Sequence, residues 1–273
     1  MLQTEQRNPN TMHIDKCSTN EILEFIQIEN IYAAQAVGKA LPQITKACDA
    51  IEAQMRKGGR LIYIGAGSSG RLGVLDAAEC PPTYGVSPET VMGIMAGGKE
   101  CMFRASENAE DGADAGIRDL KEHNITANDV IVGISAAGNA AYVAEALRFA
   151  KSIGSVTIGL TCNHGSLTDT IADISIVTET GPEVVTGSTR MKAGTAQKMV
   201  TNMLSTCVMI RLGMVYENMM INLKPSNAKL RQRVINIVCE ILHCSEDEAI
   251  ASLEENNWNI RQTVESREVH DEL

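Results

Sequence analysis

The chain has 273 residues, 44% of them hydrophobic and 21% charged, which is typical of a globular protein with one large core and a small appendage. Its formal net charge of −10 argues against nucleic acid or an anionic membrane surface as a partner. No apolar run approaches the roughly 20 residues of a membrane span. The eight cysteines form no CxxC pair and Gln3–Asp15 is polar, so we expect reduced thiols, no signal peptide and a cytoplasmic location.

The first part of the chain has helical periodicity. Residues 1–10 are expected to form a flexible tail. From Ser18 to Lys57 the apolar residues recur at three- and four-residue spacing, which predicts helices. Ser18 or Thr19 is suited to begin the first helix, and Pro42 sits where a second would start. We assign residues 1–44 to this tail and its helices.

Short apolar, β-branched runs then alternate with helix-length stretches. The predicted strands are Arg60–Ile64, Val91–Met95, Val130–Ile134, Ser155–Leu160 and Ile174–Val177. The predicted helices are Gly70–Glu79, Cys101–His123, Ala140–Ile153 and a shorter one after Ser166. This alternation predicts an α/β domain over residues 45–222, with a doubly wound, flavodoxin-like, five-stranded parallel sheet covered on both faces.

The rest of the chain is predicted to be helical. Thr189–Leu212 is a long, methionine-rich helix suited to core packing or to a subunit interface. Residues 223–273 form a small C-terminal segment with three short helices, predicted at Val234–Leu242, Ser245–Leu253 and Trp258–Val264. Ser245 and Asn257 are plausible caps for two of them.

Ligands bind beyond the carboxyl ends of the strands in sheets of this type, and the first loop there is rich in glycine and serine. Gly67, Ser68 and Ser69 follow the first strand directly. Glycines allow close backbone approach, and the next helix offers free N–H groups to an anion, so the loop is either a phosphate site or a plain tight turn. It lacks the lysine of a Walker loop, and no acidic residue completes a dinucleotide fingerprint.

Two further loops have polar side chains. At the start of the long helix, Ser188, Thr189 and Lys192 fit an anion site, although an ordinary capped, basic helix start would have the same composition. After the third strand, Ser135 and Asn139 are the only polar side chains of an otherwise small and permissive loop.

Two glutamates are candidates for acid–base chemistry. Glu79 lies at a predicted helix end, before Pro81 and Pro82, where the helix dipole is unfavourable to a carboxylate. Glu110 lies early in a predicted helix. From chemistry alone, either could equally be a solvated surface charge.

Three segments together resemble the N-acetylmuramic acid 6-phosphate etherase family of sugar-isomerase (SIS) domain proteins, which is related to the glucokinase regulatory protein. They read GAGSSGRLGVLDAAECPPTYGV, SENAEDG and GPEVVTGSTRMKAGTAQK, and the resemblance runs from about Asp15 to Leu253. It implies a SIS-type sheet and a homodimer with sites completed by the neighbouring subunit. It also implies cleavage of the D-lactyl ether at C3 of the sugar by elimination and hydration, without metal or cofactor.

The resemblance also implies roles for individual residues. Glu110 would remove the C2 proton of the ring-opened aldehyde, and Glu79 would protonate the leaving lactate oxygen and then activate water. The phosphate of the small-molecule substrate would be held by a set of loop residues. These are Gly67, Ser68, Ser69, Ser135, Asn139, Ser188, Thr189 and Lys192.

The chain departs from the family pattern in the loop after the third strand. The family usually has Ala-Ser-Gly-Arg-Thr-Pro-Tyr, where this chain has Ala136-Ala137-Gly138-Asn139-Ala140-Ala141-Tyr142. The lost donors predict weaker phosphate binding or altered specificity. They also support one alternative, a non-catalytic sugar-phosphate sensor. A second alternative is an aldose–ketose isomerase of the same fold, which also begins by removing a C2 proton. The C-terminal segment is shorter than usual for the family and resembles a ubiquitin-associated-like helical fold.

Overall fold

The computed structural model describes residues 2–104, 106, 108–223, 225 and 227–271, and contacts divide the chain into two compact units. The first comprises Met1–Ala78 and Pro88–Val208, and the second Glu79–Ser87 and Met209–Leu273. Residues 209–222 therefore group with the C-terminal helices, whereas the sequence predicted a boundary after residue 222. Residues 105 and 107 of the predicted helix 101–123, and Lys224, lie outside the described residues. No helix of the described part is long and apolar enough to cross a membrane.

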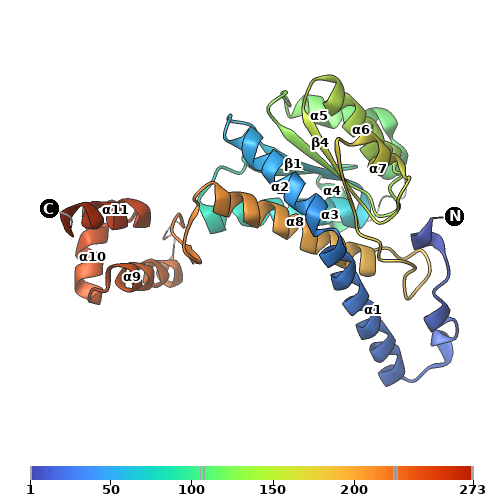
Figure 1. Ribbon diagram of the computed structural model, residues 1–273, viewed down its shortest axis with the longest axis horizontal. Helices are drawn as coiled ribbons and strands as arrows, with labels where there is room; N and C mark the ends of the chain where they lie inside the picture. Colours follow the sequence, from blue (N-terminus) through green and yellow to red (C-terminus); the bar gives the residue numbers. More distant parts are fainter. Residues whose placement is uncertain (1, 105, 107, 224, 226, 272–273) are drawn as a thin grey trace. The chain divides into compact units, whose positions relative to one another are not determined.

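The first unit is built on a five-stranded sheet in which all neighbouring strands are parallel. The strands are β1 (Leu61–Gly65), β2 (Val91–Met95), β3 (Val130–Ile134), β4 (Val156–Thr161) and β5 (Ile174–Val177). Their order, β2-β1-β3-β4-β5, is the doubly wound, flavodoxin-like order and confirms the predicted fold class. The strands are mostly apolar, and β1 and β3 are buried along their whole length, because helices cover both faces of the sheet (Figure 1).

Alternate side chains of β1 pack against helices on opposite faces of the sheet. Ile62 and Ile64 belong to a buried cluster with residues of α5 (Ala113–Glu122) and α6 (Ala141–Ser152). Tyr63 points the other way, and its hydroxyl donates to Asp76 of α3 (Gly67–Tyr84) and to a carbonyl of α8 (Lys192–Arg211). The helices α2 (Leu41–Met55) and α7 (Leu167–Ile171) complete the layers, and each packs on β5.

A buried carboxylate fastens α3 to α8. Asp76 accepts hydrogen bonds from Asn202 at 2.6 Å and from Ser205 at 3.1 Å, in addition to the bond from Tyr63. Burial raises the pKa of Asp76, and these three hydrogen bonds act against the rise. The two helices are therefore held side by side by their side chains as well as by the sheet.

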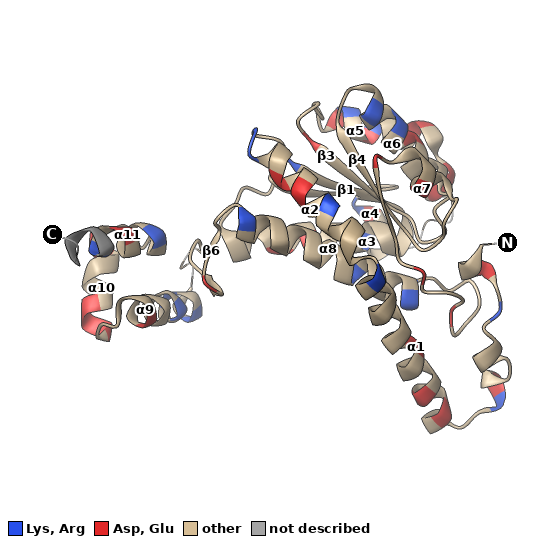
Figure 2. Ribbon diagram, in the orientation of Figure 1, with Lys and Arg blue, Asp and Glu red and all other residues tan. Residues whose placement is uncertain are grey.

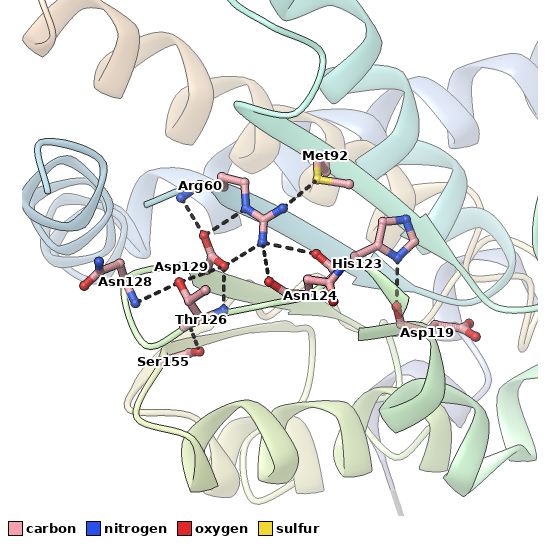
Figure 3. A network of polar contacts seen from close by, with 9 residues as sticks. All are labelled: Arg60, Met92, Asp119, His123, Asn124, Thr126, Asn128, Asp129 and Ser155. Carbon is pink, nitrogen blue, oxygen red and sulfur yellow. Dashed lines mark hydrogen bonds and ion pairs between the residues drawn. The ribbon is translucent and has the colours of Figure 1, made fainter. Parts of the chain in front are cut away.

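An ion pair between Arg60 and Asp129 joins the amino ends of β1 and β3, opposite the carboxyl ends of the strands (Figure 3). Asp129 accepts from the backbone N–H of Arg60 at 2.9 Å, from its guanidinium at 2.8 and 3.0 Å, and from the N–H of Thr126 at 2.7 Å. Burial acts to raise the pKa of Asp129, but the bonds from Arg60 and Thr126 outweigh it and hold the pKa below its usual range.

Two predicted helices of the first half of the chain differ clearly from those observed, and two C-terminal helices are longer than predicted, α9 at its start and α11 at its end. α3 continues through Pro81 and Pro82 to Tyr84, so the predicted stop at Glu79 is wrong. Each proline removes one backbone donor, and two adjacent prolines near the helix end leave the earlier turns intact. The predicted helix 101–123 is divided into α4 (Glu100–Phe103), the short 3₁₀ helix η4 (Ala109–Asp111) and α5, because Gly112 takes a non-helical conformation between the last two.

The N-terminal residues are folded rather than flexible. Thr4 and Asn8 are buried, in and beside the 3₁₀ helices η1 (Gln3–Glu5) and η2 (Pro9–Thr11), which η3 (Ile14–Lys16) follows. Asn163 donates to the Thr4 hydroxyl at 3.1 Å. Ser18 then begins α1 (Thr19–Lys39) with a capping box, as predicted. The expected tail is wrong because polar side chains become buried once they find partners, and hydrophobic periodicity does not detect this.

The second unit contains a hairpin and three helices. They are β6 (Val215–Tyr216), β7 (Met219–Met220), α9 (Ala228–Leu242), α10 (Glu246–Glu255) and α11 (Ile260–Asp271). Their apolar faces form one buried cluster, while α9 is basic and the start of α10 is acidic (Figure 2). Ser245 caps α10 as predicted, but Asn259, not Asn257, accepts the capping bond at the start of α11.

Candidate active site

A cavity of about 330 Å³, here called the strand-end cavity, opens at the carboxyl ends of β1 and β3. It is lined by Ala66, Gly67, Ser68, Ser69, Glu110, Asp111, Ile134, Ser135, Ala136, Ala137, Asn139, Ala140 and Thr189. Seven of the predicted site residues are in this set: Gly67, Ser68, Ser69, Glu110, Ser135, Asn139 and Thr189. The cavity lies where open α/β sheets bind ligands.

The loop after β1 requires glycine because its backbone turns back closely on itself. A Cβ on Gly70 would lie 2.5 Å from the carbonyl oxygen of Gly65, and Gly67 has a φ of +55°. α3 begins at Gly67, so the N–H groups of its first turn have no partner within the helix and can bind an anion. Ser69 is buried, and its hydroxyl donates to the Gln197 side chain at 2.9 Å.

The loop after β3 is shaped by its two polar side chains. Ser135 is buried, and its hydroxyl accepts from the N–H of Gly138 at 3.1 Å. Asn139 accepts from the N–H of Leu167 at 3.0 Å, which joins the loop to the start of α7. Gly138 has a φ of +83°, and a Cβ there would lie 2.1 Å from the Ser166 hydroxyl oxygen. Both side chains thus hold the loop and still have donors for a ligand.

Glu110 and its neighbour Asp111 bring the carboxylates to the strand-end cavity. Both lie on η4, and both are exposed. Glu79 is also exposed, but it is not among the described residues that line this cavity. Glu79 is assigned to the second compact unit, so the described lining of this cavity contains one of the two predicted acid–base residues, Glu110.

Ser188 and Lys192 also lie outside the lining of the cavity. The Lys192 side chain is 4% exposed, and its amine forms an ion pair with the equally buried Glu29 of α1. It also donates to the carbonyl of Pro182 at 3.0 Å. Burial acts to raise the pKa of Glu29. Hydrogen bonds, of which the one from Lys192 has the largest effect, outweigh burial and lower the pKa. The lysine thus ties α1 to the loop that precedes α8.

Two residues that support the site were missed by the sequence reasoning. Glu183 accepts the backbone N–H groups of Lys192 and Ala193 at 2.9 and 3.0 Å and so caps α8, and burial raises its pKa. Gln197 holds the Ser69 hydroxyl from the buried face of α8. Gln197 could have been found from the sequence, because it is a polar residue at a position of the predicted helix that is expected to be buried.

Comparisons with known proteins place the fold among SIS-domain proteins. Residues 43–151 match the family model of the glucokinase regulatory protein N-terminal SIS domain, and residues 98–207 match that of the SIS domain. A phosphoheptose isomerase from Neisseria gonorrhoeae superposes with a TM-score of 0.55 at 20% identity, over 70% of this chain and 98% of that one. A putative phosphosugar isomerase from Bacteroides fragilis gives 0.54 at 23% identity, over 72% and 94%.

The sequence relatives are closer. The N-acetylmuramic acid 6-phosphate etherase of Clostridium beijerinckii is 52% identical over 96% of this chain and 86% of its own length. The etherase of Aeromonas hydrophila is 54% identical over 88% and 81%, and that of Bacillus subtilis is 48% identical over 96% and 86%. The fold is thus that of a SIS-domain protein, and the sequence relatives are named as enzymes. The chain belongs to the N-acetylmuramic acid 6-phosphate etherase family.

Proposed function

We propose that this protein is a carbon–oxygen lyase that cleaves the D-lactyl ether of N-acetylmuramic acid 6-phosphate, giving N-acetylglucosamine 6-phosphate and D-lactate. The observation that carries the proposal is the strand-end cavity, which combines a phosphate-type loop with the carboxylate of Glu110. The sequence relatives are named as etherases of N-acetylmuramic acid 6-phosphate, which supports this substrate. Turnover of this sugar phosphate fits a role in cell-wall recycling in the cytoplasm.

The phosphate would bind at the start of α3. The free N–H groups at the start of the helix and the hydroxyls of Ser68 and Thr189 supply donors, and Ser135 and Asn139 line the same cavity. Ser69 would contribute its backbone N–H, because its hydroxyl already donates to Gln197. Ser188 and Lys192 lie outside the lining, so their contribution to phosphate binding would have to be indirect. The loop after β3 has alanines where the family usually has donors, which predicts a lower affinity than in the relatives.

The chemistry requires a base and an acid. Glu110 removes the C2 proton, which the adjacent aldehyde acidifies, and the electron pair forms the C2–C3 double bond as the C3–O bond breaks. Glu79 gives its proton to the departing lactate oxygen. It then takes a proton from water as the water oxygen adds to C3, and C2 is reprotonated. Neither step uses a metal or a cofactor.

We further propose a homodimer in which Glu79 of the partner subunit completes the site. Its support is the absence of Glu79 from the described lining of the cavity that holds Glu110. α1 offers a surface for a second copy, because Leu23, Ile28, Ile31 and Tyr32 are exposed on it, between 49% and 59%.

Exchange of the C2 proton with deuterated water tests this division of roles. Glu79→Gln should still exchange C2 while releasing no lactate, whereas Glu110→Gln should lose both reactions. Glu100→Gln, a change at an exposed glutamate outside the cavity, serves as the control and should match the wild type. Loss of C2 exchange in Glu79→Gln, or its persistence in Glu110→Gln, would overturn the assignment. Formation of a ketose without lactate would favour the isomerase.

A further inference from the structure

A second cavity, of about 440 Å³, lies between α3 and α8 and adjoins the strand-end cavity at Ser68, which lines both. We call it the α3–α8 cavity. Its lining consists of Ser68, Arg71 and Leu72 from α3, with Arg190, Gly194, Thr195, Lys198 and Met199 from α8 and the loop before it. Ser68 and Leu72 are one turn apart on α3, as are Gly194 and Lys198 on α8, so each pair presents one helix face to the cavity.

The α3–α8 cavity is positively charged in a protein whose net charge is −10. Its lining contains Arg71, Arg190 and Lys198 and no acidic side chain. Within the described part of the chain, neither Arg190 nor Lys198 forms an ion pair, although the charge of Lys198 acts on the buried Asp76 carboxylate, which has three hydrogen-bond donors of its own. The cations therefore leave an excess of positive charge that suits an anionic ligand.

Arg71 is held in place by neutral partners. Its guanidinium donates to the carbonyl oxygens of Cys101 at 2.6 Å, Met102 at 3.0 Å and Arg104 at 3.3 Å. These bonds fix the side chain against the end of α4 without cancelling its charge. Arg190 and Lys198 are exposed, so their charged groups are accessible to a ligand.

The proposed substrate has two anionic groups, the phosphate at C6 and the carboxylate of the lactyl group at C3. The strand-end cavity has donors for the phosphate, and the adjoining cavity has cations for a second anion. On the basis of the proposed function, we infer that the α3–α8 cavity binds the lactyl carboxylate, with Arg190 and Lys198 as its main partners. Arginine is suited to this because its planar fork pairs with both carboxylate oxygens.

This subsite would distinguish the substrate from other sugar phosphates. N-acetylglucosamine 6-phosphate has the phosphate but not the carboxylate, so it can occupy only the first cavity. D-lactate has only the carboxylate and can occupy only the second. Anchoring the lactyl group also fixes the C3 oxygen that must accept a proton before the bond breaks.

The test compares Arg190→Gln, Lys198→Gln and their double variant with the wild type and with Lys57→Gln, a control at an exposed lysine outside both cavities. Dissociation constants are measured by calorimetry in the Glu110→Gln background, so that no turnover occurs. The single changes should weaken N-acetylmuramic acid 6-phosphate about tenfold to a hundredfold. They should change binding of N-acetylglucosamine 6-phosphate less than about twofold. Arg190→Lys should recover part of the loss.

Inhibition by D-lactate is a second measurement and should be lost in the double variant. Equally weakened binding of both sugar phosphates would overturn the inference, because the cations would then bind the phosphate. Unchanged binding of both would also overturn it, because the cations would then be plain surface charges. Failure of the proposed function has a different signature. Wild-type protein would then release no lactate, whereas failure of the subsite alone would leave lactate release intact in all the Arg190 and Lys198 variants.

Discussion

At the scale of single residues, Lys192 differs most from its expected role, because its amine forms a buried ion pair with Glu29. The sequence placed Lys192 on the phosphate, whereas the structure gives its amine to Glu29 and to the carbonyl of Pro182. A buried ion pair is costly to break because the remaining charge has no partner.

We therefore expect Lys192→Met to lower the free energy of unfolding by about 3–5 kcal/mol, as measured by urea denaturation. Lys192→Met combined with Glu29→Met should cost less than the single change, since no buried charge remains unpaired. A stable Lys192→Met protein with a greatly raised KM would contradict this and would indicate that the lysine binds the substrate phosphate.

At the scale of the elements, Arg60 and Asp129 join β1 to β3 at the end of the sheet opposite the candidate site. Asp129 has a lowered pKa in the folded protein. The unfolded state therefore binds more protons in the acid range, and stability rises with pH there. The contribution of this carboxylate is complete above the pKa of about 4 that an aspartate has in the unfolded chain, and it is lost as the pH falls through the lowered folded value.

Asp129→Asn should lower the free energy of unfolding by about 3 kcal/mol near neutral pH, because it leaves the Arg60 charge without its partner. The difference between wild type and variant should shrink as the pH falls below about 4. Denaturation curves recorded across that range measure both effects. A difference that stayed constant with pH would show that the carboxylate charge has no part in it.

The elements also show what sequence reasoning can reach. The five strands were predicted within a residue or two, because runs such as Val130–Ile134 are apolar on both faces and only a covered parallel sheet accommodates them. The first loop was found from its glycines. The burial of Thr4, the pairing of Lys192 and the support of Ser69 by Gln197 were not found, because each depends on a partner far away in the sequence.

At the scale of the whole molecule, the proposed homodimer has a direct consequence. Glu79→Gln and Glu110→Gln proteins should each be inactive alone. In a mixed dimer, one site would combine Glu110 of one chain with Glu79 of the partner subunit, both intact. Mixing the two variants under conditions that exchange subunits should therefore restore activity, to roughly a quarter of the wild-type value, since random pairing makes half of the dimers mixed and one of their two sites complete.

No recovery after demonstrated subunit exchange would mean that both glutamates act within one chain. The control is a mixture of either variant with Glu100→Gln. This mixture contains sites with both Glu79 and Glu110 intact, whether the site lies within one chain or is shared between two chains. The C-terminal helices α9, α10 and α11, in the segment predicted to be ubiquitin-associated-like, contribute no residue to the proposed chemistry.

The most direct measurement is release of D-lactate from N-acetylmuramic acid 6-phosphate by the wild-type protein beside Glu110→Gln. We predict steady release by the wild type and a loss of roughly a hundredfold to ten-thousandfold in the variant, the usual contribution of a positioned acid–base group. If the wild type bound the sugar phosphate at saturation and released no lactate, the enzyme assignment would be contradicted, and the strand-end cavity would belong to a sugar-phosphate sensor.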